Sequence, residues 1–257
     1  MTGQTQTLAV PWEHWVRRWD AQQEVYIEAR ERCYDVMFSF VEALLPDDLT
    51  VLDLAAGCGA ISRRILRRLP KATSVAVEVD PVMLRLGEGT LGDLGGRLRW
   101  VKADLREPGW PSALGQDSFD VVMSTTATHW LRPPELAAVY RQVAQLLRPG
   151  GVLLNGDGLY LPNHQPRIRA AVEAVSERRQ ARAVERGAEV WDTWWEALRA
   201  EPSLRDAFAE RDRIFPPGPR DPSPKLAFHE AALLEAGFEE VGVVWQDLTT
   251  RVLLALR

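Results

Sequence analysis

The chain has 257 residues, of which 46% are hydrophobic and 26% are charged, as expected of a globular protein with a sizeable core. Its formal net charge of −5 argues against a nucleic-acid substrate, and no apolar stretch of about eighteen or more residues predicts a membrane span. Cys33 and Cys58 match no zinc or redox spacing, and the first residues show no secretory-signal pattern. We therefore expect a cytoplasmic protein that binds no metal, nucleic acid or membrane.

The first predicted element is an aromatic helix within residues 1–48. Trp12, Trp15 and Trp19 recur at spacings of three and four, which places them along one face of a helix, with Tyr26 further on. Two interpretations remain open. The stripe packs on the sheet or a neighbouring helix, or it forms a lid over a ligand site, with Trp19 and Tyr26 against the ligand.

Residues 51–59, Val-Leu-Asp-Leu-Ala-Ala-Gly-Cys-Gly, predict a buried strand followed by a glycine turn and a helix. Asp53 is unusual within such a strand, because a carboxylate is costly to bury without a partner. Gly57 and Gly59 allow the tight turn and the close backbone approach that a ligand at a helix N-terminus requires. These features predict a nucleoside-cofactor site at the carboxyl end of the first strand.

The chief alternative is the dinucleotide site of a nicotinamide-dependent oxidoreductase. That fingerprint has a third glycine where this chain has Ser62, and it requires no acid ahead of the first glycine. The pattern instead resembles motif I of class I S-adenosylmethionine-dependent methyltransferases. The resemblance implies cofactor contacts at Asp53, Ala55, Gly57 and Gly59.

A helix over 60–69 carries arginines on its outer face, which we interpret as an ordinary solvated face. The next strand, 73–79, ends with Glu78 about twenty residues beyond the glycine turn, where a carboxylate meets ribose hydroxyls in nucleoside-binding sheets. Asp80 is followed by proline, the pattern of an N-cap and a first helical residue. We therefore assign Glu78, with Val79 beside it, to the cofactor and Asp80 mainly to capping.

A third strand, 98–102, is followed by Asp104 and Leu105. The resemblance implies that Asp104 receives the exocyclic amine of adenine and that Leu105 lines the ring. Otherwise Asp104 is an ordinary turn residue. A fourth strand opens with Phe-Asp, as in motif IV of the family, and ends at Ser124 and Thr125, which we also expect to face the cofactor.

The loop after the fourth strand contains His129, our candidate for a general base. A histidine with a pKa of about 6.5 can accept a proton near neutrality, and the resemblance places this loop beside the transferred methyl. Alternatively, the His129–Trp130 pair is structural. His164 and His229 are rival candidates.

A fifth strand is predicted over 152–155, and the final segment, 225–257, predicts a helix and two strands. These strands, 241–245 and 249–256, are separated by a tight connection at 246–247. A terminal antiparallel hairpin is how the resembling family closes its sheet, whereas a dinucleotide fold would continue with a parallel unit.

Residues 158–224 are too many for a structureless loop in a compact domain. They predict helices over 165–186 and near 203–213, followed by a proline-rich return. We interpret the segment as a helical cap whose tryptophans wall an apolar acceptor pocket. Packing of the cap on the core is the equal alternative. The expected acceptor contacts are Trp19, Tyr26, Trp130, His164, Trp191, Trp194, Trp195 and His229.

The predicted fold class is a Rossmann-like α/β fold with a seven-stranded sheet, helices on both faces and a terminal antiparallel hairpin. We expect a lid at 1–48, a cofactor-binding core at 49–157, a cap at 158–224 and a core-completing segment at 225–257.

The resemblance implies a methyltransferase with S-adenosylmethionine as cofactor and S-adenosylhomocysteine as product. Its acceptor would be a small, partly aromatic or apolar molecule, methylated at oxygen. Two alternatives to the methyltransferase remain: the nicotinamide-dependent oxidoreductase and a non-catalytic protein that binds S-adenosylmethionine. The sequence identifies neither the acceptor nor the oligomeric state. Under a lid, the methionine carboxylate would meet one of Arg17, Arg18, Tyr26 and Arg30.

Overall fold

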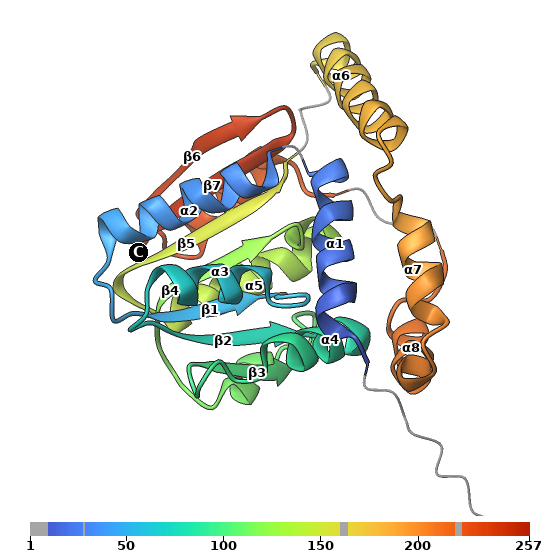
Figure 1. Cartoon of the computed structure of the whole chain (residues 1–257). Coiled ribbons are helices and arrows are strands. Elements are labelled where there is room, and N and C mark those ends of the chain that lie inside the picture. Colours follow the sequence, from blue (N-terminus) through green and yellow to red (C-terminus); the bar gives the residue numbers. More distant parts are fainter. Residues whose placement is uncertain (1–9, 28, 160–163, 219–222) are drawn as a thin grey trace, which may run out of the picture.

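The computed structural model describes residues 10–27, 29–159, 164–218 and 223–257 (Figure 1). At its centre lies a seven-stranded sheet in the order β3-β2-β1-β4-β5-β7-β6. The first five strands are parallel, and β7 pairs antiparallel with both β5 and β6. This is the predicted fold class. The strands are β1 (Thr50–Leu54), β2 (Thr73–Glu78), β3 (Leu98–Lys102), β4 (Phe119–Thr125), β5 (Leu147–Gly158), β6 (Glu240–Asp247) and β7 (Thr250–Leu256).

Helices cover both faces of the sheet because its parallel strands have apolar side chains on both sides. Leu52 and Leu54 of β1 lie in one apolar cluster, with α5 (Pro133–Leu146) and α9 (Leu226–Glu235). Val51 lies in the opposite cluster, with α2 (Arg30–Leu44) and α3 (Ala60–Arg68). The alternation of residues along β1 thus decides which helices each side chain meets.

A third apolar cluster joins the N-terminal helix to the segment predicted as a cap. It combines Trp15 and Val16 of α1 (Trp12–Tyr26) with side chains of α4 (Pro81–Leu91). From the other side come Trp194 of α7 (Trp191–Arg199) and Phe208 of α8 (Arg205–Ile214). Figure 1 shows α1 near the carboxyl ends of the strands, with α7 and α8 beyond it. The helix α6 (Pro166–Glu185) has no buried residue.

The structure differs from the predicted elements in three places. The hairpin turn is Leu248-Thr249, since Asp247 still pairs with Thr250, so the predicted connection at 246–247 is wrong. The fifth strand begins at Leu147, which pairs with Phe119. The tryptophans of 191–195 form a helix that the sequence analysis did not predict.

Part of the proline-rich return, 219–222, lies outside the described residues. Across the described ranges, no helix is both long enough and apolar enough to cross a membrane. Nor do these ranges contain a group of three or more His, Cys, Asp or Glu side chains that could hold a metal ion.

The contact between α1 and α4 depends on Gly89, where a Cβ atom would lie 2.4 Å from the ring of Trp12. Gly89→Ala should therefore displace α1 and lower the free energy of unfolding by about 1 kcal/mol, since overpacking outweighs the gain in helix propensity. The measurement is thermal unfolding together with the rate of tryptic cleavage after Arg17 and Arg18, which should rise. Gly109→Ala is the control, because a Cβ at Gly109 would meet nothing within 4 Å. Equal behaviour of the two variants would contradict this packing.

Candidate active site

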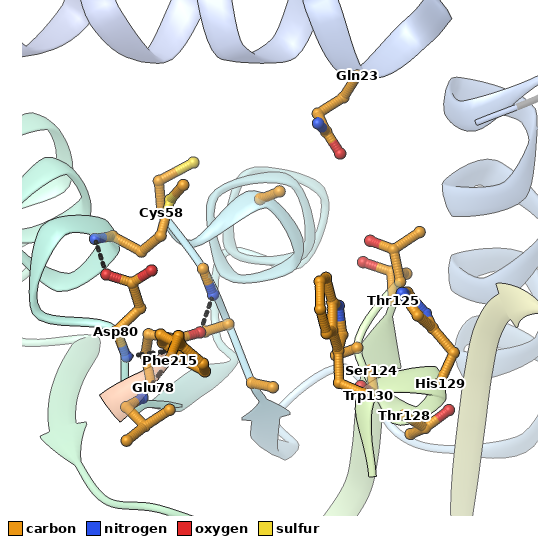
Figure 2. A pocket seen from close by; sticks show the side chains of 18 of the residues that line it. Gln23, Cys58, Glu78, Asp80, Ser124, Thr125, Thr128, His129, Trp130 and Phe215 are labelled. Atoms are coloured by element: carbon orange, nitrogen blue, oxygen red, sulfur yellow. Dashed lines mark hydrogen bonds between the residues drawn. The ribbon is translucent and has the colours of Figure 1, made fainter. Parts of the chain in front are cut away.

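A cavity of about 930 Å³ opens at the carboxyl ends of the parallel strands, the edge at which open α/β sheets bind ligands. The strand ends and the loops after them form its floor, and α1, α7 and α8 contribute its other walls. Figure 2 shows Glu78 and Asp80 on one side of this space and Thr125 and His129 on the other, with Gln23 reaching in from α1.

Asp53 is buried beneath the glycine turn and is absent from the cavity lining. Its Oδ2 accepts hydrogen bonds from the backbone N–H of Ser62 at 2.9 Å and from the Ser62 hydroxyl at 2.7 Å. Burial raises the pKa of Asp53 to about 6, although both bonds from Ser62 favour the anion. The residue at the place of a third glycine is therefore the partner of the unusual acid, and the pair ties β1 to α3.

The glycine turn leaves open space above its backbone. A Cβ at Gly57, whose φ is +56°, would meet nothing within 4 Å, and Ala55 and Gly57 both line the cavity. Gly59 has another role, since a Cβ there would lie 2.8 Å from the ring of Trp100. Gly59 is absent from the lining and permits close packing at the start of α3 instead.

Glu78 lies at the end of β2 and is held by backbone donors. Its Oε2 accepts a hydrogen bond from the N–H of Gly57 at 2.7 Å, and its Oε1 accepts from Val79 at 2.7 Å and Asp80 at 2.8 Å. Burial raises the pKa of Glu78 to about 7, and the neighbouring charge of Asp80 acts in the same direction. Val79 lies beside Glu78 in the cavity lining.

Asp80 caps α4, as predicted. Its Oδ1 accepts from the N–H groups of Val82 at 2.9 Å and Met83 at 3.4 Å. Its Oδ2 accepts from Nε of Arg211 at 2.7 Å, an ion pair that joins α8 to the strand end. The guanidinium of Arg211 also lies 4.0 Å from the ring centroid of Trp195. One acid thus both caps α4 and anchors α8.

Asp104 and Leu105 line the cavity after β3. Both carboxylate oxygens of Asp104 accept from the guanidinium of Arg106, at distances between 2.6 and 3.0 Å. Partial burial opposes the charge, but Arg106 holds the pKa of Asp104 below its usual value. An adenine amine at Asp104 would therefore share this carboxylate with Arg106.

Arg30 lies between the glycine turn and the N-terminal helices. It is buried, lines the cavity and pairs with Asp20 at 2.9 Å, and its Nε has no partner. Two of the other candidates for the methionine carboxylate, Arg17 and Arg18, are absent from the lining. Arg17 is exposed and Arg18 pairs with Glu189, which leaves Arg30 and Tyr26 in position.

His129 lies opposite Glu78, in the short helix η2 (Thr128–Trp130). Its Nδ1 is 2.7 Å from Oδ1 of Asp157, a fully buried carboxylate near the end of β5. Burial alone would raise the pKa of Asp157, but His129, Thr128 and the N–H of Gly158 lower it to about 2. The anion therefore keeps a proton on Nδ1, which makes Nε2 the basic nitrogen of the neutral ring.

The sequence analysis missed Asp157, which lines the cavity. It follows a predicted strand within Asn-Gly-Asp-Gly, and an acid between two glycines at a strand end was the available signal. Only the fold, however, brings it to His129.

Most predicted contact residues converge on this cavity. Trp194 is fully buried and donates from its Nε1 to the backbone oxygen of Trp15 at 3.3 Å, so it packs the helices together and lines no pocket. His229 is fully buried against the hydroxyl of Tyr140, and His164 is exposed elsewhere. Those that do line the cavity are Ala55, Gly57, Glu78, Val79, Asp104, Leu105, Ser124, Thr125, His129, Trp19, Tyr26, Trp130, Trp191 and Trp195.

Comparisons with known proteins agree with this geometry. Residues 51–151 match the family model of a methyltransferase domain. Trans-aconitate 2-methyltransferase of Azoarcus sp. is 32% identical over 135 residues, covering 52% of this chain and 49% of the relative. Malonyl-[acyl-carrier protein] O-methyltransferase of Halorhodospira halophila is 30% identical over 191 residues, covering 73% and 62%. The chain thus spans about half to three fifths of the length of these relatives.

Among solved structures, an O-methyltransferase family protein from Burkholderia thailandensis shares the fold. The TM-score is 0.54 at 19% identity, covering 95% of this chain and 70% of that one. The chain belongs to the class I S-adenosylmethionine-dependent methyltransferases, whose methyl donor is S-adenosylmethionine. The oxidoreductase alternative loses its support, since the sheet ends in the antiparallel hairpin of this family.

The residues present fit this cofactor. The open space above Gly57 gives a nucleoside room to approach the backbone, and Glu78 offers a carboxylate to ribose hydroxyls at the end of β2. The unpartnered Nε of buried Arg30 is a donor for the methionine carboxylate on the other side of the turn. Glu78, Arg30 and the turn would therefore hold the two ends of the cofactor.

Cofactor binding should depend on pH through Glu78. Ribose hydroxyls donate to the carboxylate, so they favour its charged form, and affinity should fall as the pH drops through about 7. We expect the affinity for S-adenosylhomocysteine, measured by calorimetry, to fall about three- to tenfold between pH 8 and 6. Glu78→Gln should bind weakly and without this pH dependence. A comparable loss in Asp80→Asn, or a flat profile in the parent, would contradict the assignment to Glu78.

Proposed function

We propose that the protein transfers a methyl group from S-adenosylmethionine to a hydroxyl oxygen of a small, uncharged, partly aromatic acceptor. One observation carries the proposal: the pair formed by His129 and the buried carboxylate of Asp157 shares a cavity with Glu78 and with a wall of tryptophans. The chain's relatives support methylation at oxygen, since one acts as an O-methyltransferase on the malonyl group of an acyl-carrier protein.

The chemistry needs little from the protein beyond alignment, a base and the exclusion of water. S-adenosylmethionine supplies, when bound, an activated methyl group, because its positively charged sulfonium sulfur can leave as a neutral thioether. Nε2 of His129 accepts the acceptor's hydroxyl proton as the oxygen bonds to the methyl carbon. The resulting imidazolium is neutralised by Asp157, whose carboxylate is already ionised. Asp157 therefore both orients the base and stabilises its charged product.

The charges around the cavity favour an uncharged acceptor. Each guanidinium that lines it already has a carboxylate partner at 2.6 to 2.9 Å. The charge of each guanidinium is therefore already offset, which leaves little net positive charge to attract a polyanionic acceptor. The part of the cavity wall formed by tryptophans carries no charge and can contact an aromatic acceptor. The paired side chains are Arg30 with Asp20, Arg106 with Asp104, Arg199 with Asp212, and Arg211 with Asp80.

Trp19, Trp191 and Trp195 form the aromatic wall, with ring centroids 5.2 to 6.0 Å apart. Such contacts fix the rings relative to one another, so the wall is preformed and loses little entropy on binding. Trp130 lies next to His129, on the side of the cavity opposite Glu78 and Asp80. An aromatic acceptor between them would present its hydroxyl to the base.

Acceptor charge gives a direct test with matched compounds. Naphthol and naphthoic acid share their ring system and differ in a hydroxyl against a carboxylate, and trans-aconitate represents the substrate named for one relative. We expect kcat/KM for naphthol to exceed that for both acids by about tenfold or more, because each acid brings uncompensated charge into the aromatic site. Release of S-adenosylhomocysteine gives the rate, and mass spectrometry identifies the methylated product. Faster esterification of either acid would contradict the proposed acceptor class.

The base is tested by His129→Gln. We expect a methylation rate about 10²- to 10⁴-fold lower with an unchanged affinity for S-adenosylhomocysteine. His164→Gln is the matched control and should keep the parent rate, since His164 is exposed and outside the cavity lining. A normal rate in His129→Gln would show that His129 only lines the cavity and is not the base. Tight cofactor binding by the parent protein without turnover of any acceptor would favour a non-catalytic binding protein.

A further inference from the structure

The carboxylate behind His129 is held by more than the histidine. Oδ1 of Asp157 accepts from the N–H of Gly158 at 2.7 Å, in addition to Nδ1 of His129. Oδ2 accepts from the backbone N–H of His129 at 3.0 Å and from the hydroxyl of Thr128 at 2.7 Å. The Thr128 hydroxyl is the one donor among these that a substitution can remove while both the base and the backbone stay in place.

A second contact fixes the direction of this hydroxyl. Nδ2 of Asn155, fully buried on β5, is 2.9 Å from Oγ1 of Thr128. The ionised carboxylate of Asp157 can only accept, so the single O–H of Thr128 must point to it. Thr128 then has only acceptor capacity left for Asn155, whose amide must donate. The chain of donors runs one way, from Asn155 through Thr128 to Asp157.

We propose that Thr128, aimed by Asn155, is a positioning residue that sets the orientation and basicity of His129 through the carboxylate of Asp157. The inference rests on the proposed function, since it concerns the base of that reaction. Thr128 needs no contact with the acceptor to act in this way. Its hydroxyl takes up part of the negative charge of Asp157, which moderates the hold of that carboxylate on the imidazolium.

The sign of the effect follows from this sharing of charge. Without the hydroxyl, the Asp157 carboxylate has one donor fewer and attracts the positive charge of the imidazolium more strongly. His129 should then stay protonated to higher pH. At neutral pH less of the base would be available, and its ring would be less firmly oriented.

Apart from Glu78, the titratable groups near the pair keep a constant charge between pH 5 and 9. Burial raises the pKa of Cys33 to about 12 and that of Tyr140 well above its usual value, and it lowers the pKa of His229 to about 4. Glu78, with a pKa of about 7, lies across the cavity and is common to all variants compared. The groups concerned are Cys33 of α2, Tyr140 of α5, His229 of α9, Glu78 of β2 and Arg251, which lies opposite Asp157 in β7.

The test compares Thr128→Val, which keeps the shape and loses the hydroxyl, with Thr128→Ser, which keeps the hydroxyl. The first readout needs no acceptor: the titration midpoint of the His129 ring by NMR in the complex with S-adenosylhomocysteine. His129→Gln assigns its signals among the four histidines. We expect Thr128→Val to raise the midpoint by about half a pH unit to one unit and Thr128→Ser to restore it. An unchanged midpoint in Thr128→Val would overturn the proposal.

The second readout is the single-turnover rate with naphthol at saturating cofactor. Thr128→Val should lower this rate about 10- to 100-fold near neutral pH and shift its acidic limb upward, with S-adenosylhomocysteine affinity within about twofold of the parent. In a His129→Gln background the same substitution should add less than about twofold, because its effect passes through the histidine.

The two proposals fail in different ways. Equal losses from Thr128→Val in both backgrounds would show that Thr128 only packs the loop, and would overturn the inference while leaving the base in place. A normal rate in His129→Gln would instead remove the base itself. In that case the proposed function fails first, whatever Thr128→Val does to the midpoint.

Discussion

The burial of carboxylates at the carboxyl edge of the sheet is the constraint on which the site depends. Asp53, Glu78, Asp80 and Asp157 are all at most 7% exposed, and each would be strongly destabilising without donors. Each of them accepts a hydrogen bond from a backbone N–H group at a strand end, in the glycine turn or in the first turn of the following helix. A parallel sheet places its strand ends side by side, so the donors to these acids and the floor of the cavity are assembled together, although Oδ1 of Asp53 has no partner. The acids then differ by environment: Glu78 is held near its neutral form, with a pKa of about 7, and Asp157 is held fully ionised, with a pKa of about 2. Glu78 therefore becomes fully charged only when ribose hydroxyls donate to it or the pH rises, whereas Asp157 is charged before His129 takes up a proton.

The N-terminal helix and the segment after β5 are coupled to this edge and to each other. The apolar cluster of Trp15, Trp194 and Phe208 reaches α4, and Arg211 binds the cap residue of the same helix. Removing residues 158–224 would therefore expose the side of α1 and α4 and free the Asp80 carboxylate, so cofactor binding and cap docking are not independent properties. Trp15 of the aromatic stripe packs into the cluster, and Trp19 packs against it and also lines the cavity. A contact between Trp19 and a ligand stays a prediction.

The sequence predicted what depends on short-range pattern and missed what depends on distant side chains. The alternation around Glu78 placed that acid in the cavity, and the Asp-Pro pair after it placed Asp80 at a helix cap; the structure adds that Asp80 lines the cavity as well. Residue spacing could not show that Ser62 is the partner of Asp53, since their bond forms only when the helix folds back on the strand. The same holds for His129 and Asp157, which are 28 positions apart and meet because β4 and β5 are neighbours. Trp194 was wrongly grouped with the pocket residues because a composition signal does not give the rotation of a helix.

The rotation of α7 gives it one face that packs on the neighbouring helices and another that lines the cavity. Trp194 and Leu198, four positions apart, lie on the face that is fully buried against α1 and η3 (Pro202–Leu204), while Trp191 and Trp195, also four apart, lie on the face toward the cavity. Substitutions at 194 and 198 would undo the docking of the helix, because large side chains there leave cavities when shortened. A substitution at 191 would reshape the cavity with little effect on that docking face, whereas Trp195 also packs against the apolar cluster and the guanidinium of Arg211, so a change there would affect both. The two turns of α7 thus hold the wall in place through Trp194 and Leu198 and define its inner surface through Trp191 and Trp195. A change at Trp191 can therefore alter the space for the acceptor while Trp194 and Leu198 keep the helix docked.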